Sequence, residues 1–122
     1  MKYLCLVYAD EAKLAALPQH ELDTLIDETL ASNEALQASG HLILAQALEQ
    51  VDAAITVRVR DGRLSATDGP FAETREQLGG FVFIEARDLN EAIRIAGRIP
   101  SARLGSIEVR PAVDLLRERS VP

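Results

Sequence analysis

Residues 54–67 read AITVRVRDGRLSAT, and the pattern of this stretch predicts a β-hairpin. Ile55, Val57 and Val59 alternate with polar residues, which is the period of a strand that presents one apolar face. Asp61 and Gly62 form a two-residue turn of the kind whose positive backbone dihedrals match the twist of paired strands. We therefore expect residues 54–60 to pair with residues 63–67.

Four further strands are expected outside the hairpin, because short apolar runs without a helical period are bounded there by turn-forming residues. They span residues 2–8, 41–48, 81–86 and 105–111. The run at 81–86, FVFIEA, is apolar on both faces and is therefore expected at the centre of its sheet.

Two helices are expected between these strands. The first is amphipathic, starts at Pro18 and ends near Gly40, with leucines spaced three and four residues apart. The second starts at Asp88, where Glu91 completes a capping box, and Pro100 stops it. We expect its buried stripe to consist of Leu89, Ala92, Ile93, Ala96 and Ile99.

The order strand, helix, strand, hairpin, strand, helix, strand is the split β-α-β arrangement of a ferredoxin-like α+β domain. Residues 1–122 are expected to form this one domain. Residues 72–77 are expected to form one helical turn, and residues 113–119 a short helix or an arm on a partner. Both main helices would cover one face of the sheet and leave the other bare, so we expect a homodimer that buries the bare face.

The composition argues against several classes of function. The chain has 122 residues, a formal net charge of −6 and no Trp, so it offers neither the positive field nor the stacking surface that nucleic acids need. The first apolar run ends at Tyr8 and is too short for a signal peptide or a membrane span, so we expect a cytoplasmic protein without a membrane partner. Cys5, the sole cysteine, is expected to be a buried apolar residue. No residue spacing fits a metal site or a nucleotide loop, so no cofactor is expected.

The motif DGPF at residues 68–71 opens a longer stretch, DGPFAETREQLGGF, that ends at residue 81. This stretch resembles the signature of the DGPF branch of the YCII-related family. The segments TVR at 56–58, PSAR at 100–103 and GSIEVRP at 105–111 are each similar to a segment of that branch, in the same order. The resemblance implies a dimeric α/β barrel, in which the sheets of two subunits enclose a shared interior. It also implies a transcription-related protein partner, because some members are encoded near sigma factors, although most lack an assigned reaction.

His20 enters through the wider YCII-related family. A few of its members resemble acid–base enzymes that act on ring-cleavage products, and these carry a histidine near the start of the first helix. His20 occupies a comparable place, so the resemblance implies a catalytic role for it. The DGPF branch usually has an acidic residue there, and the alternative is that His20 is a coincidental surface residue.

The residues of the DGPF loop are the first candidates for a site. Asp68 follows a strand, where its carboxylate either caps the next turn or borders a ligand pocket. Phe71 is expected to return toward the core beside that pocket. Glu73, Arg75 and Glu76 follow, and they either hold a small polar ligand in a cleft or form a solvated turn.

The last strand offers a second group of candidates. Glu108 and Arg110 share one of its faces, and Glu85 shares a face with Phe81 and Phe83 on the central strand. If these faces line the barrel interior, the carboxylates would lie near apolar walls in a setting suited to proton transfer. The alternative is a structural ion pair of Glu85 or Glu108 with Arg110.

Two functions follow from these candidates. The first is a small-molecule-binding or regulatory module that uses a pocket near the DGPF loop, or whose charged loop docks another protein. The second is a cofactor-free acid–base enzyme of the isomerase or lyase type that acts on a small anionic metabolite. In that enzyme Asp68 or His20 would be the base, and Arg75 or Arg110 would hold the anion.

Overall fold

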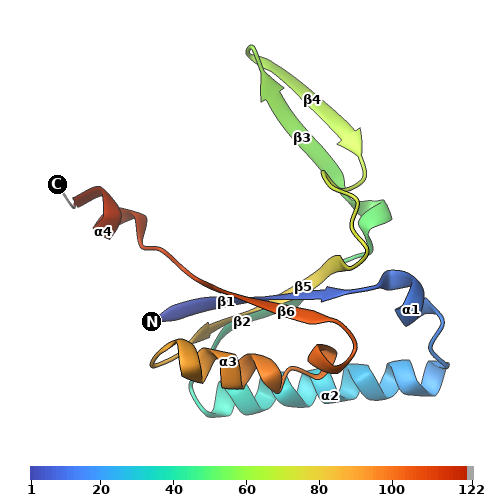
Figure 1. Ribbon diagram of the computed structural model, residues 1–122, viewed down its shortest axis with the longest axis vertical. Helices are drawn as coiled ribbons and strands as arrows, with labels where there is room; N and C mark the ends of the chain where they lie inside the picture. Colours follow the sequence, from blue (N-terminus) through green and yellow to red (C-terminus); the bar gives the residue numbers. More distant parts are fainter. Residues whose placement is uncertain (121–122) are drawn as a thin grey trace.

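The computed structural model describes residues 1–120, which form a four-stranded antiparallel sheet and a separate hairpin (Figure 1). The strand order in the sheet is β2-β5-β1-β6. The bounds of these strands are Lys2–Ala9 for β1, Leu42–Ala47 for β2, Gln77–Glu85 for β5 and Ser106–Pro111 for β6. The α+β ferredoxin-like fold expected from the sequence is confirmed, and so is the central place of β5.

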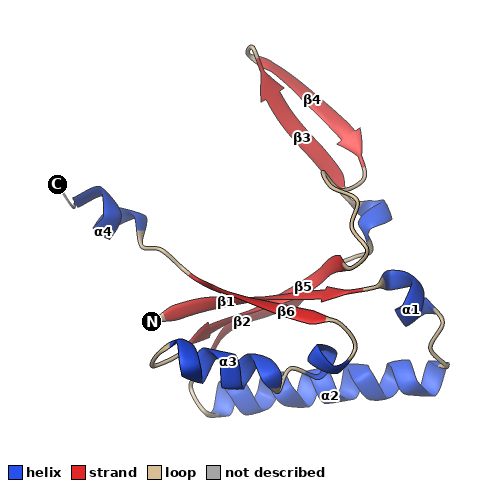
Figure 2. Cartoon of the chain, viewed as in Figure 1, coloured by secondary structure: helices blue, strands red, loops and turns tan. Residues whose placement is uncertain are grey.

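The two long helices lie on the same face of the sheet (Figure 2). They are α2, Gln19–Ala38, and α3, Leu89–Gly97. The remaining helices are short: α1 spans Glu11–Ala15, η1 Val51–Ala53, η2 Pro100–Arg103 and α4 Leu115–Ser120. No helix was expected at α1, but the Asp10 side chain accepts hydrogen bonds from the backbone N–H groups of Ala12 and Lys13 and so caps this helix.

The core lies between the sheet and α3. Cys5 is opposite both Val82 and Val109, so these three side chains share the face that the helices cover. From α3, the inward stripe is Ala92, Ile95, Ala96 and the following Ile99. The expected stripe was partly wrong, because Leu89 and Ile93 are 48% and 52% exposed. Burial raises the pKa of the Cys5 thiol to about 11, which suits the buried apolar role predicted for it.

The opposite face of the sheet carries apolar side chains that no element among residues 1–120 covers. Leu4 and Leu6 of β1 pair with Phe83 and Phe81 of β5, and Leu44 of β2 also pairs with Phe83. We call these five residues and Tyr8 the bare face. The hairpin and α4 extend on this side of the sheet, away from α2 and α3 (Figure 1).

The hairpin forms as predicted, from β3, Ile55–Arg60, and β4, Arg63–Asp68. Asp61 and Gly62 have φ angles of 52° and 74°, the positive values that a two-residue turn with strand-like twist requires. The hairpin does not join the four-stranded sheet.

The helical turn expected at residues 72–77 is absent, because this segment forms bends and Gln77 already belongs to β5. The side chains of Thr74 and Gln77 donate hydrogen bonds to carbonyl groups inside the segment. Such bonds compete with the backbone bonds of a helix. Across residues 1–120, no helix combines the length and the apolar character needed to span a bilayer.

Candidate functional site

The DGPF loop lies at the base of the hairpin and is held there by backbone groups. Gly69 has a φ of 99°, a conformation that favours glycine, and its N–H donates to the carbonyl of Ala54 at 2.7 Å. The hydroxyl of Thr56 donates to the carbonyl of Gly69 at 2.8 Å. The Asp68 carboxylate is exposed and accepts no hydrogen bond from the described residues, so Asp68 does not cap this turn. The turn is held by the hydrogen bonds of Thr56 and Gly69.

A pocket of about 940 Å³ opens beside this loop, between the base of the hairpin and one end of the sheet. We call it the loop pocket. Its apolar wall includes Leu48, Val51, Phe71 and Leu78. The expectation that Phe71 returns to the core is wrong: its side chain is 80% exposed at the edge of this pocket.

Two side chains tie the segments around the loop pocket together. The Glu11 carboxylate accepts from the N–H of Val51 at 3.0 Å, which joins α1 to η1. The Gln77 carboxamide accepts from the N–H of Glu11 at 2.9 Å and donates to the carbonyl of Thr74 at 2.6 Å. Three chain segments that are distant in sequence are therefore fixed around one opening.

The charged lining of the loop pocket is mainly cationic. Arg58 and Arg60 line it, and because they alternate with Val59 along β3 they share one face of the hairpin. Neither guanidinium makes an ion pair with the described residues, while Glu49 is the one carboxylate in the lining. Tyr8 supplies a phenol from β1, and among residues 1–120 its hydroxyl has no hydrogen-bond partner.

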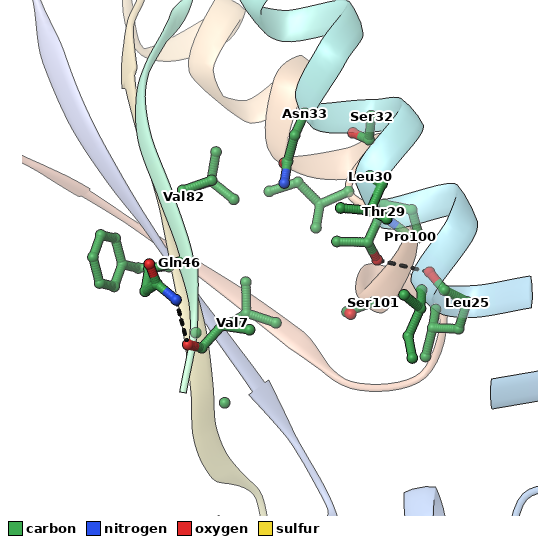
Figure 3. Close-up of a pocket in the computed structure, with 17 residues that line it drawn as sticks. Val7, Leu25, Thr29, Leu30, Ser32, Asn33, Gln46, Val82, Pro100 and Ser101 are labelled. Atoms are coloured by element: carbon green, nitrogen blue, oxygen red, sulfur yellow. Dashed lines mark hydrogen bonds between the residues drawn. The ribbon is translucent and has the colours of Figure 1, made fainter. Parts of the chain in front are cut away.

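A second pocket, of about 450 Å³, lies between α2 and the sheet (Figure 3). We call it the helix pocket. Neighbouring residues on β1, on β5 and at the end of β2 divide between the two pockets: Val7, Ala47 and Gly79 line the helix pocket, whereas Tyr8, Leu48 and Leu78 line the loop pocket. Successive strand residues point to opposite faces, so the two pockets lie back to back at the same end of the sheet.

Most of the site residues predicted from the sequence lie outside both pockets. Asp68, Glu73 and Arg75 are exposed and line neither one. Glu76 is half-buried, and its carboxylate accepts from the Ser106 hydroxyl at 2.7 Å, so it ties the loop to β6. His20 is exposed in the first turn of α2 and also lies outside both linings. Phe71 is the one predicted site residue that lines the loop pocket.

The acidic candidates on the sheet are already engaged. Glu108 forms an ion pair with Arg110, two residues along the same strand. The Glu85 carboxylate lies 3.0 Å from the N-terminal ammonium group. The ion-pair alternative therefore holds for Glu108. The pair joins two residues of the same strand, so it does not link strands or subunits.

Sequence reasoning missed Tyr8, Arg58 and Arg60 as site residues. The alternation that predicted the hairpin did assign both arginines to its polar face. The alternation did not predict the position of the hairpin relative to the sheet. This position depends on loop residues 68–76 and on the side-chain hydrogen bonds of Glu11 and Gln77.

The class of protein is defined by this architecture: it is the ferredoxin-like fold of dimeric α/β barrels, with an inserted hairpin. Residues 1–115 match the YCII-related domain family, and the chain belongs to that family. An uncharacterised protein of Rhizobium meliloti (strain 1021) is 36% identical over 113 residues, which cover 91% of each chain. Among solved structures, the fold is similar to that of 5-chloro-2-hydroxyhydroquinone dehydrochlorinase from Burkholderia phenoliruptrix, in complex with 2,5-dihydroxybenzoquinone. That match has a TM-score of 0.54 and 17% identity, and covers 93% of this chain and 94% of the other.

Proposed function

We propose that the protein binds a small anionic molecule with an apolar body in the loop pocket and acts as a ligand-responsive regulatory module. The observation that carries this proposal is the combination of Arg58, Arg60 and Tyr8 with an apolar wall around a single opening. The pocket volume lies within the range typical of small-molecule sites, which are mostly apolar with a few placed polar groups.

The charge of the ligand follows from the two arginines. A guanidinium presents several N–H donors in a planar fork that matches a carboxylate. Arg58 and Arg60 have no carboxylate partner among the described residues, so an anion would supply one. The Tyr8 hydroxyl adds a further donor to the lining, and Leu48 and Leu78 would contact an apolar ring.

An acid–base enzyme of the isomerase or lyase type is the alternative. Its support is the fold it shares with a dehydrochlorinase that was solved with a small quinone. Asp68 and His20, the predicted bases, lie outside the pocket lining, so the proton carrier would have to be Tyr8 or Glu49. Since no histidine lines the loop pocket, binding is the function that its geometry supports better.

The proposal includes a homodimer formed through the bare face. A large apolar sheet surface is unfavourable in water and is commonly buried by a second copy with two-fold symmetry. Tyr8 belongs both to the bare face and to the loop pocket, so a partner on this face would also close over the ligand. Within the YCII-related family, we assign the chain to the DGPF branch on the motif at residues 68–71.

Thermal unfolding in the presence of benzoate tests the ligand site. At ten times its dissociation constant, benzoate would raise the melting temperature of the wild type by about 5 °C. Arg58→Gln should remove most of this shift. Arg94→Gln is the matched control, because Arg94 is exposed on α3 and lines neither pocket, and it should keep the full shift.

Asp68→Asn separates the loop pocket from the site first expected at the loop. The exposed Asp68 carboxylate is outside the lining, so this variant should respond to benzoate as the wild type does. Loss of the shift in Asp68→Asn but not in Arg58→Gln would overturn the proposal, as would the absence of any shift in the wild type.

A further inference from the structure

The helix pocket differs in chemistry from the loop pocket that lies behind it. No charged side chain lines it, and its walls are made by aliphatic side chains such as Val7, Leu25, Val82 and Ile99. A charged ligand would lose its hydration there without gaining a counter-ion, which is costly. The pocket therefore selects neutral molecules.

Small residues of the sheet create the hollow beneath α2. Ala45 and Ala47 of β2 and Gly80 of β5 share the face that the helices cover, as their pairing register requires. Gly80 has no space for a larger side chain, because an added Cβ would lie 2.8 Å from the carbonyl oxygen of Gln46. Ile26 and Leu30 of α2 line the same pocket and are 49% and 56% exposed, so the helix does not fill the space left by these small residues.

Asn33 is the largest of the polar side chains of the helix pocket that are free to bind a ligand. Figure 3 shows its carboxamide reaching from α2 toward the strands, with Val82 facing it. Two of the other labelled polar groups are engaged: the Thr29 hydroxyl donates to the carbonyl of Leu25 at 2.8 Å, and Gln46 donates to the carbonyl of Ala47 at 3.0 Å. The smaller Ser32 and Ser101 hydroxyls have no hydrogen-bond partner among the described residues. The half-buried Asn33 side chain has no hydrogen-bond partner among the described residues.

We propose that the helix pocket is a second binding site, for a neutral and mostly apolar small molecule whose amide or carbonyl group hydrogen-bonds to Asn33. The carboxamide of Asn33 offers two N–H donors and one acceptor, which is the complement of another amide. The aliphatic walls would enclose a ring next to that group, and the volume of the pocket is enough for a molecule of this size. This site stands independently of anion binding in the loop pocket.

Benzamide and benzoate make a matched pair of probes, because they have nearly the same shape and differ in charge. In ¹⁵N-resolved NMR spectra of the whole chain, benzamide should shift the amide signals of Gly79 and Gly80, which line only the helix pocket. Benzoate should leave these two signals unchanged. If it binds the loop pocket, it should shift signals from Ala72 and Thr74.

Asn33→Leu tests the role of the carboxamide, because leucine is similar in size but cannot form the hydrogen bond. Loss of one hydrogen bond to the ligand should weaken benzamide binding on the order of tenfold. Asn90→Leu is the matched control, since Asn90 is exposed on α3 and away from both linings, and it should bind benzamide as the wild type does.

Three results would overturn the second site: no shift of Gly79 and Gly80 at millimolar benzamide, equal shifts with benzoate, or unchanged affinity in Asn33→Leu. If benzoate fails to shift any signal while benzamide binds, the loop-pocket proposal fails and the helix-pocket proposal stands. If benzamide fails to shift any signal while benzoate binds, the helix-pocket proposal fails and the loop-pocket proposal stands.

Discussion

Both faces of the sheet carry large apolar side chains, but the surroundings of the two faces are very different. Along β1, Tyr3 and Cys5 point toward the helices and are 2% and 0% exposed, whereas the intervening Leu4 and the next residue, Leu6, point to the bare face and are only half-buried. The covered face can be satisfied within one chain because α2 and α3 supply its partners. The bare face cannot, so the same alternation that builds the core also creates a surface for binding something else.

Ile84→Ala should have the largest effect, because Ile84 is fully buried on the covered face. Truncation of a buried isoleucine leaves a cavity and should lower the free energy of unfolding by about 2–5 kcal/mol, measured by urea denaturation. Ile93→Ala is the matched control: its side chain is 52% exposed on α3, so the loss should be below about 1 kcal/mol. Equal losses for the two variants would contradict the assignment of the covered face.

Phe83→Glu tests the bare face. A carboxylate at this position would have to be buried twice in the proposed two-fold interface, so we expect the variant to be monomeric at concentrations where the wild type forms the proposed dimer. Sedimentation velocity at micromolar concentration measures this difference. Ile93→Glu places the same charge on the helix side and should remain dimeric. A monomeric wild type would remove the homodimer from the proposed function.

Much of this fold was predictable from local patterns. The Asp61–Gly62 turn and the alternation of Ile55, Val57 and Val59 determined the hairpin almost to the residue, because both are properties of neighbouring residues. Asp88 likewise caps α3, accepting from the N–H of Glu91 at 2.9 Å. In the expected capping box, Glu91 would accept from Asp88, but its carboxylate accepts from the N–H of Arg87.

The predictions that were wrong or absent concern contacts between segments that are distant in sequence. The sequence pattern placed Ile93 in the buried stripe of α3, but Ile95 is the residue that packs in the core cluster, together with Ile84. The site was harder still, because the loop pocket joins β1, η1, the hairpin and the start of β5, and no single stretch of sequence contains it. Phe71 was expected to return toward the core after the Gly69-Pro70 turn, but its side chain is 80% exposed at the pocket edge.

Glu91→Gln should have the smallest effect. It tests the contact between Glu91 of α3 and His41, the residue before β2. The N–H of Arg87 holds the pKa of Glu91 below its ordinary value of 4.5, helped by the Arg87 guanidinium and by His41, 3.3 Å away at the start of β2. The charged carboxylate therefore stabilises the fold above pH 4.5, and this contribution is lost as the pH falls through the lowered pKa. Urea denaturation should show the wild type to be more stable than Glu91→Gln at neutral pH, with the difference shrinking in acid. Glu34→Gln, on the exposed side of α2, is the control, and its stability relative to the wild type should not change with pH. If the stability difference between the wild type and Glu91→Gln stays constant with pH, the hydrogen bond from Arg87 does not depend on the charge of Glu91.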